Sequence, residues 1–283
     1  MKKRIKKILN KFIKIKKEPV YIPVLEGTIL LNKTVLITGG ASGLGLAITN
    51  TALSNGAFVI ITGRDEDKLK NACNQIIKNN CIYKNKIFFT KLDISDVSNI
   101  KKEIEKAISI SPTKRIDILI NNAGIASSCS LGDTTEQELD MVINTNLKGT
   151  YFMCQEVANY FIHNSIKGNI LNISSVSGKR PAITPYMLSK NGIISLTQGI
   201  AKKFIKYGIV VNGLAPGPIA TGMLNVEGKN LNYDNSPSKR FADAKEIANW
   251  AVILVSDLGK MIVGETIFIT GGCGNLTYDD IQY

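Results

Sequence analysis

The sequence is poor in the residues that most often build metal centres and disulfide frameworks. It has one histidine and one tryptophan in 283 residues, and its five cysteines include no Cys-x-x-Cys pair. This pattern indicates free thiols in a reducing compartment, so we expect a cytoplasmic protein without disulfides or a bound metal. No apolar run approaches the roughly 18 residues of a membrane-spanning helix, which argues against a transmembrane segment.

Acidic residues are missing from the first 17 positions, which hold nine lysines or arginines. The net charge is +12, yet the remaining 266 residues carry 26 basic and 23 acidic side chains and are nearly balanced. Five apolar residues recur at helical spacing in this stretch: Ile5, Ile8, Leu9, Phe12 and Ile13. We therefore predict that residues 1–27 form a basic amphipathic extension, of which residues 1–17 are able to contact an anionic membrane surface peripherally. A disordered, solvated tail is the alternative. Nucleic acid is not expected, because no aromatic or groove-reading elements accompany the charge.

Beyond residue 27, short β-branched runs alternate with longer segments of helical spacing. The strand candidates begin at Thr34, Phe58, Lys86, Ile116, Asn169, Ile209 and Thr266, and the helix candidates include residues 44–54, 67–78, 136–162 and 187–206. Most strand candidates are apolar at successive positions, as strands covered on both faces are. The alternation predicts an α/β protein: one Rossmann-type domain over residues 28–283, with a doubly wound, seven-stranded parallel sheet and helices on both faces.

The first strand candidate runs into the glycine-rich stretch "TGGASGLGLAI". Gly39, Gly43 and Gly45 follow the pattern G-x-x-x-G-x-G, with Ser42 and Leu44 between them. Glycine lets the backbone turn tightly and approach a pyrophosphate, while the following helix presents its N–H groups and positive dipole end. At this place in an α/β chain, the stretch predicts a dinucleotide site.

The end of the second strand candidate bears on which dinucleotide binds. An NAD-preferring protein places Asp or Glu there, on the ribose 2′-hydroxyl. Here Gly63 occupies that place and Arg64 follows, which favours the 2′-phosphate of NADP(H). NAD(H) remains the alternative, because Asp65 could serve as the acid if the turn is offset.

Further motifs follow in order along residues 30–272. They are "LDISD" with Asp93 and Ile94, "NNAG" with Asn121, Ala123 and Gly124, "NTNLKGT" with Asn146, "NISSVSG" with Ser175, "YMLSK" with Tyr186 and Lys190, "NGLAPGPIAT" with Pro216, Gly217, Ile219 and Thr221, and "GETIFITGG". Together with the glycine turn, they resemble the short-chain dehydrogenase/reductase family of roughly 250-residue proteins. The stretch "SPSKRFADAKEIANWAVIL" is similar to a region of 3-oxoacyl-carrier-protein reductases.

The resemblance implies catalytic roles for Asn146, Ser175, Tyr186 and Lys190. Reducing a ketone requires a proton for the oxygen, and a tyrosine whose pKa is lowered by a neighbouring ammonium suits that task. Lys190 lies four residues after Tyr186, on the same helical face, and would lower that pKa and hold the nicotinamide ribose. Ser175 would steady the developing charge on the substrate oxygen. The family's asparagine implies that Asn146 holds a water linking Lys190 to solvent.

By the same resemblance, the cofactor contacts include the residues named above from the glycine turn, Arg64, Asp93, Ile94, "NNAG" and "NGLAPGPIAT", together with Tyr186 and Lys190. We expect an NADP(H)-dependent oxidoreductase that interconverts a ketone and a secondary alcohol, acting on a 3-oxoacyl thioester or a sugar or polyol. A non-catalytic NAD(P)-sensing regulatory protein is the alternative. The resemblance also implies a homo-tetramer or homo-dimer, and residues 222–238 suggest a lid over the substrate.

Overall fold

The computed structural model describes residues 26–127, 129–221 and 231–277. The predicted basic extension lies outside this part of the chain except for its last two residues. The predicted lid is described only from residue 231 onward.

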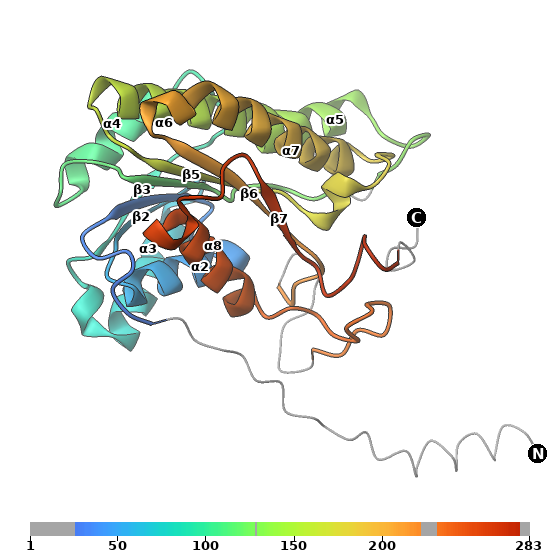
Figure 1. Ribbon diagram of the computed structural model, residues 1–283, viewed down its shortest axis with the longest axis horizontal. Helices are drawn as coiled ribbons and strands as arrows, with labels where there is room; N and C mark the ends of the chain where they lie inside the picture. The colour runs from blue at the N-terminus through green and yellow to red at the C-terminus, as the bar shows by residue number, and fades with distance from the viewer. Residues whose placement is uncertain (1–25, 128, 222–230, 278–283) are drawn as a thin grey trace, which may run out of the picture.

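A parallel sheet of seven strands, ordered β3-β2-β1-β4-β5-β6-β7, forms the centre of the described part of the chain (Figure 1). The strands are β1 (Thr34–Thr38), β2 (Phe58–Gly63), β3 (Ile87–Lys91), β4 (Ile118–Asn121), β5 (Asn169–Ile173), β6 (Val210–Pro216) and β7 (Thr266–Ile269). The predicted seven-stranded, doubly wound fold is confirmed. Four strands begin at the predicted residue, and β3, β4 and β6 begin one or two residues later.

Helices cover both faces of the sheet (Figure 1). One layer holds α2 (Gly43–Ser54), α3 (Glu66–Asn79) and α8 (Ala244–Val255), and the other holds α4 (Ile100–Ile110), α5 (Glu136–Ile143), α6 (Thr150–His163) and α7 (Pro185–Phe204). Successive side chains of a strand point to opposite faces, so Leu36 and Ile37 of β1 enter different cores. Ile37 packs in the same cluster as Ile48 and Val252, whereas Leu36 packs in the cluster of Val157. None of the described helices combines the length and apolarity needed to cross a bilayer.

The predicted helical segment 136–162 departs from a uniform α-helix at its middle. A π-helical stretch, Asn144–Gly149, separates α5 from α6. A Cβ on Gly149 would lie 2.5 Å from the carbonyl oxygen of Ile94, so the glycine permits a close approach to the loop after β3. Local widening of this kind often occurs at functional sites, and Asn146 lies within it.

The first strand of the chain, β1, lies inside the sheet and not at an edge. The chain proceeds from β1 to one edge through β2 and β3, then returns to build the other half from β4. The loops after β1 and β4 therefore leave neighbouring strand ends in opposite directions. In open α/β sheets, ligands bind in the crevice at such a reversal.

Candidate active site

A cleft of about 1140 Å³ runs along the carboxyl ends of the strands. Most of the residues predicted for the site line it: Gly39, Ser42, Gly43, Leu44, Gly45, Arg64, Asp93, Ile94, Ala123, Gly124, Ser175, Tyr186, Lys190, Pro216, Gly217, Ile219 and Thr221. Segments far apart in the sequence thus meet around one cavity. Asn121 and Asn146 are not among the lining residues.

The glycine turn after β1 has the geometry of a phosphate cradle. Gly39 and Gly43 have φ angles of +65° and +51°, a region that favours glycine. A Cβ on Gly45 would lie 2.1 Å from the carbonyl oxygen of Gly39, so a side chain there would force the turn apart. The Ser42 side chain makes no capping bond to α2, and the first turn holds no acidic residue. Its N–H groups and positive dipole end therefore suit an anion such as a pyrophosphate.

Asn122, which the sequence reasoning did not single out, fixes this turn from the next strand. Its side-chain amide donates to the carbonyl oxygens of Thr38 and Gly39 at 3.0 and 3.1 Å. The Thr38 hydroxyl accepts from the backbone of Asn122 and Ala123, both at 3.0 Å. The second asparagine of "NNAG" was visible in the sequence, but nothing local distinguished it from the first.

The prediction that Asn121 contacts the cofactor is corrected by its position. Its side-chain amide donates to Asn172 Oδ1 at 2.9 Å and to Cys154 Sγ at 3.1 Å, inside the layer between the sheet and α6. Because successive residues of a strand face opposite ways, Asn121 holds the core and Asn122 faces the cleft. We therefore exclude Asn121 from the cofactor contacts that we propose.

The turn after β2 brings two cations to the cleft. Arg64 is exposed and lines the cavity, as does Lys68 from the first turn of α3, a residue the sequence reasoning missed. Asp65 caps α3 by accepting a hydrogen bond from the Lys68 backbone N–H at 2.9 Å. This carboxylate is thus engaged by the protein itself. Asp93 is held too, since its Oδ1 accepts from the backbone and hydroxyl of Ser95.

The N-terminus of α7 positions the tyrosine and the lysine. Thr184 caps the helix by accepting from the Met187 N–H at 3.1 Å, and Pro185 occupies the first turn. Lys190 then follows Tyr186 by one helical turn, with its Nζ 5.7 Å from the centre of the phenol ring. That ammonium donates to the carbonyl oxygen of Ile173, at the end of β5, at 2.9 Å.

The two serines of "NISSVSG" have different environments. Ser174 donates its hydroxyl to the carbonyl oxygen of Lys190 at 2.8 Å and so ties β5 to α7. The Ser175 hydroxyl forms a hydrogen bond with Tyr186 and accepts the Ser177 N–H at 3.1 Å. The choice of Ser175 as the serine beside the tyrosine therefore agrees with this contact.

Burial controls the protonation of the pair. Burial raises the pKa of the Tyr186 hydroxyl above its ordinary value, and the hydrogen bond with Ser175 offsets part of the rise. Burial also lowers the pKa of Lys190, to about 8. Desolvation is the largest cause of the rise at Tyr186, and the expectation that the Lys190 ammonium lowers the pKa of Tyr186 stays a prediction. At neutral pH the phenol keeps its proton, which suits a proton donor.

Asn146 lies close to the segment that contains Tyr186 and Lys190. Its Oδ1 accepts from the backbone N–H of Ile125 at 2.8 Å, while its Nδ2 donates to the Ile125 carbonyl at 2.9 Å and to Ser189 Oγ at 3.1 Å. Ser189, also missed from the sequence, donates to the carbonyl oxygen of Tyr186 at 2.7 Å. A Cβ on Gly124 would lie 3.2 Å from Asn146 Oδ1 and 3.6 Å from Lys190 Nζ. Asn146 thus joins the loop after β4 to the helix that carries the tyrosine.

The cavity accommodates a dinucleotide and a carbonyl compound by its own geometry. The glycines of the cradle keep the turn tight, and the half-buried phenol of Tyr186, the Ser175 hydroxyl and the buried Lys190 ammonium line the same cleft. This combination can hold a cofactor and transfer a proton to a substrate oxygen.

Comparisons with known proteins agree with this chemistry. A family model described as "short chain dehydrogenase" matches residues 33–232. The 3-oxoacyl-[acyl-carrier-protein] reductase of Thermotoga maritima is 36% identical over 248 residues, covering 86% of this chain and 98% of that protein. The corresponding reductase of Chlamydia pneumoniae is 33% identical over 254 residues, covering 88% and 98%.

Solved structures resemble the chain as well. A gluconate 5-dehydrogenase from Burkholderia cenocepacia, in complex with NADP and tartrate, is 28% identical with a TM-score of 0.77, covering 86% of this chain and 95% of that one. Levodione reductase has the same identity and TM-score and is covered over 97% of its chain. The chain belongs to the short-chain dehydrogenase/reductase family, and it is an NAD(P)-dependent dehydrogenase/reductase acting on CH–OH groups.

Proposed function

We propose that the chain is an NADP(H)-dependent carbonyl reductase, with a 3-oxoacyl thioester as the leading substrate class and a sugar or polyol ketone as the second. The observation that carries the proposal is the contact between the Ser175 and Tyr186 hydroxyls, beside Lys190 in the wall of the cleft. The identity with 3-oxoacyl-carrier-protein reductases favours the thioester.

In this proposal the reduced nicotinamide, when bound, supplies the hydride that reaches the carbonyl carbon. Tyr186 donates its phenolic proton to the carbonyl oxygen, and the Ser175 hydroxyl hydrogen-bonds the same oxygen as negative charge develops. The Lys190 ammonium stabilises the phenolate that remains. Asn146 holds the Gly124–Ile125 segment beside that ammonium, where a water could return the proton from solvent.

The preference for NADP(H) is proposed from the charges at the turn after β2. Arg64 and Lys68 line the cleft there, and the carboxylate of Asp65 already caps a helix. Both cations would attract a 2′-phosphate. A 2′-hydroxyl would instead need a carboxylate acceptor, and the acid at this turn, Asp65, already accepts a hydrogen bond from the protein.

The Arg64→Glu variant tests this preference. Losing a charge-assisted contact and adding a like charge should weaken NADPH binding by about 10- to 100-fold, while NADH binding changes by less than about threefold. Fluorescence titration with each reduced cofactor gives the two dissociation constants. Lys70→Glu, the same charge change on α3 outside the cleft lining, is the control. Equal weakening for NADPH and NADH would contradict the assignment of Arg64 to the 2′-phosphate.

The function as a whole is tested by NADPH oxidation over ketoacyl thioesters, keto-sugars and simple diketones, repeated with NADH. We expect turnover of at least one 3-oxoacyl thioester. Tight cofactor binding without turnover of any carbonyl compound would instead support the NAD(P)-sensing alternative.

A homo-tetramer or homo-dimer is proposed as the assembly. Members of the family typically form oligomers, and this chain exposes large apolar side chains on neighbouring helices. Leu139 and Met141 of α5 and Leu188 of α7 are 37%, 50% and 51% exposed. Light scattering after size exclusion would measure the assembly.

A further inference from the structure

The edge of the sheet opposite the cleft forms a second surface of the fold. Parallel strands begin at the same edge, and backbone hydrogen bonds join neighbouring loops there. Phe58, the first residue of β2, donates its N–H to the Lys33 carbonyl at 2.9 Å, and Val59 donates to the Lys86 carbonyl at 2.7 Å. We call the loops that precede the other six strands the amino-edge face, which comprises residues 26–33, 80–86, 111–117, 164–168, 205–209 and 256–265.

The first and last loops of the amino-edge face lie near each other. They are brought together by α2 and α8, which pack on the same side of the sheet and both end at this edge. The pKa of Asp257 is lowered by its hydrogen bond with Lys260, at 2.9 Å, and further by the charges of Lys260 and Lys33. The ammonium groups before β1 and β7 therefore act on the same carboxylate and belong to one surface.

Basic side chains outnumber acidic ones on the amino-edge face. The acids are Glu26, Asp117, Asp257 and Glu265, and the cations are Lys33, Lys84, Lys86, Lys114, Arg115, Lys167, Lys206 and Lys260. Two of the acids are already paired, Asp117 with Arg115 at 2.5 Å and Asp257 with Lys260. The other six cations form no ion pair with any residue that the structure describes.

Large apolar and aromatic side chains are exposed among these cations. The side chains are those of Ile82, Leu258 and Met261, which are 62%, 69% and 94% exposed, together with Leu31, Ile205 and Tyr207. The Lys206 ammonium lies 5.1 Å from the centre of the Tyr207 ring, so charge and apolar surface adjoin there. A surface that combines free cations with exposed aliphatic groups suits an anionic lipid layer, because the cations meet phosphates and the aliphatic groups enter the acyl boundary.

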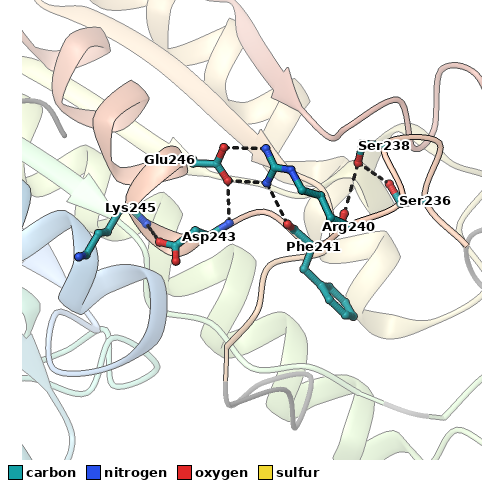
Figure 2. A network of polar contacts seen from close by, with 7 residues as sticks. All are labelled: Ser236, Ser238, Arg240, Phe241, Asp243, Lys245 and Glu246. Atoms are coloured by element: carbon teal, nitrogen blue, oxygen red, sulfur yellow. Dashed lines mark hydrogen bonds and ion pairs between the residues drawn. The ribbon is translucent and has the colours of Figure 1, made fainter. Parts of the chain in front are cut away.

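The start of α8, at the edge that carries the cleft, has paired charges instead (Figure 2). The Arg240 guanidinium donates to both carboxylate oxygens of Glu246, at 2.7 and 2.8 Å. Asp243 and Glu246 also form the capping box of the helix. Lys245 lies between these two acids in the sequence. The charges at this end are therefore balanced within the protein, and Lys245 offers a matched comparison for the lysines of the amino-edge face.

The chain enters the amino-edge face from its basic extension. Gly27 donates its N–H to the Ser54 carbonyl at 3.3 Å, and Leu30 donates to the Asn55 carbonyl at 3.0 Å, at the end of α2. The nine lysines or arginines of residues 1–17 are separated from this point by residues 18–25, which can span at most about 30 Å. The basic stretch is therefore attached at the amino-edge face and not at the cleft.

We propose that the amino-edge face docks on an anionic lipid surface, with residues 1–17 as a second point of contact. The cleft opens at the carboxyl ends of the strands, so docking leaves it directed away from the lipid. The exposed aliphatic side chains favour lipid over nucleic acid, which is bound through phosphate contacts together with base-reading or stacking groups. Like charges would repel a second copy that met this face with its own. The inference does not depend on the proposed function.

The exposed thiol of Cys81, within the amino-edge face, allows a direct test on the full chain. A nitrobenzoxadiazole fluorophore on Cys81, in a Cys129→Ser background, should shift to shorter wavelength on vesicles of phosphatidylcholine and phosphatidylglycerol. Vesicles of phosphatidylcholine alone should cause no shift. The matched control carries the fluorophore on Leu131→Cys, with both thiols replaced by serine. Leu131 is 77% exposed in the loop after β4, at the edge of the cleft, and should show no shift on either vesicle.

The contribution of the cations is measured by vesicle sedimentation. Each lysine near the lipid surface contributes about fivefold to binding, so replacing four should weaken binding by about 10²-fold. The four are changed together to glutamine: Lys33, Lys84, Lys114 and Lys167, all exposed. The control removes the same charge from the cleft-side halves of α3, α4 and α8, through glutamine at Lys70, Lys101, Lys102 and Lys245, and should change binding by less than about threefold. Both variants should bind NADPH within about twofold of the wild type, which shows that they are folded.

The other possible occupants give different results. Vesicle binding without a shift at Cys81, weakened equally by the two sets of substitutions, would assign the contact to residues 1–17 alone and overturn docking of the face. A shift at Cys81 that grows with protein concentration in the absence of vesicles, with a larger mass by light scattering, would make the face a contact between copies. Binding to duplex DNA but not to vesicles would assign the face to nucleic acid. Each of the last two results would also overturn the proposal.

Discussion

The Tyr186→Phe variant should lose ketone reduction by about 10²–10⁴-fold in kcat while binding NADPH within about twofold of the wild type. The substitution removes one hydroxyl from a helix whose capping residue, Thr184, and whose tie to Ser174 do not involve the phenol oxygen. The ring that packs beside Lys190 is retained. The change therefore removes the proton donor and leaves the cleft otherwise intact.

Steady-state NADPH oxidation and a cofactor titration on the same preparations measure the two halves of this prediction. Tyr207→Phe removes the hydroxyl of an exposed tyrosine outside the cleft and should leave both values unchanged. Turnover by Tyr186→Phe at the wild-type rate would refute the assignment. A parallel loss of NADPH binding would show that the phenol serves mainly to hold the cofactor.

The two directions of the reaction should respond oppositely to pH. Burial raises the pKa of the Tyr186 hydroxyl, so the protonated form needed for reduction persists at neutral pH. Alcohol oxidation needs the deprotonated phenol and should rise with pH across the alkaline range.

The fold was predictable because its signals are local. β1 is apolar at each inner position of "TVLIT", and the glycines after it can only serve a tight turn, so strand, turn and helix follow from neighbouring residues. Parallel strands covered on both faces need this composition. The order of these strand–helix units along the chain then leaves few sheet topologies possible.

The parts of the site that the sequence did not predict depend on contacts across the fold. Asn121 and Asn122 are identical in type, and only the direction of β4 decides which one holds Thr38 and which contacts Cys154. Ser189 gains its role because a π-helical stretch brings Asn146 opposite it. The pKa of Tyr186 depends on how completely its surroundings exclude water, a quantity that spacing to Lys190 does not contain.

Lys190→Met should move activity and stability in opposite directions. Removing the ammonium beside the phenol should lower kcat by about 10²–10³-fold, as the loss of a preorganised charge in an active site does. The same ammonium is costly to bury, since its pKa falls from 10.5 to about 8 in the folded protein. That difference corresponds to about 3 kcal/mol, offset by about 1–3 kcal/mol for the lost hydrogen bond to Ile173. We expect a net gain of up to about 2 kcal/mol in the free energy of unfolding at pH 7.

The pH dependence of this stability difference distinguishes the desolvation of Lys190 from a change in packing. Between pH 8 and 10.5, the unfolded wild type holds the Lys190 proton that the folded wild type has released, so wild-type stability rises with pH in this window. The advantage of the methionine variant should therefore shrink and then reverse. Urea unfolding of both proteins at pH 7 and pH 10 measures the change, with Lys202→Met, an exposed lysine on the same helix, as the control. An advantage that stays constant with pH would contradict the desolvation argument. A loss of turnover together with a gain of stability would identify Lys190 as a residue whose unfavourable burial serves catalysis.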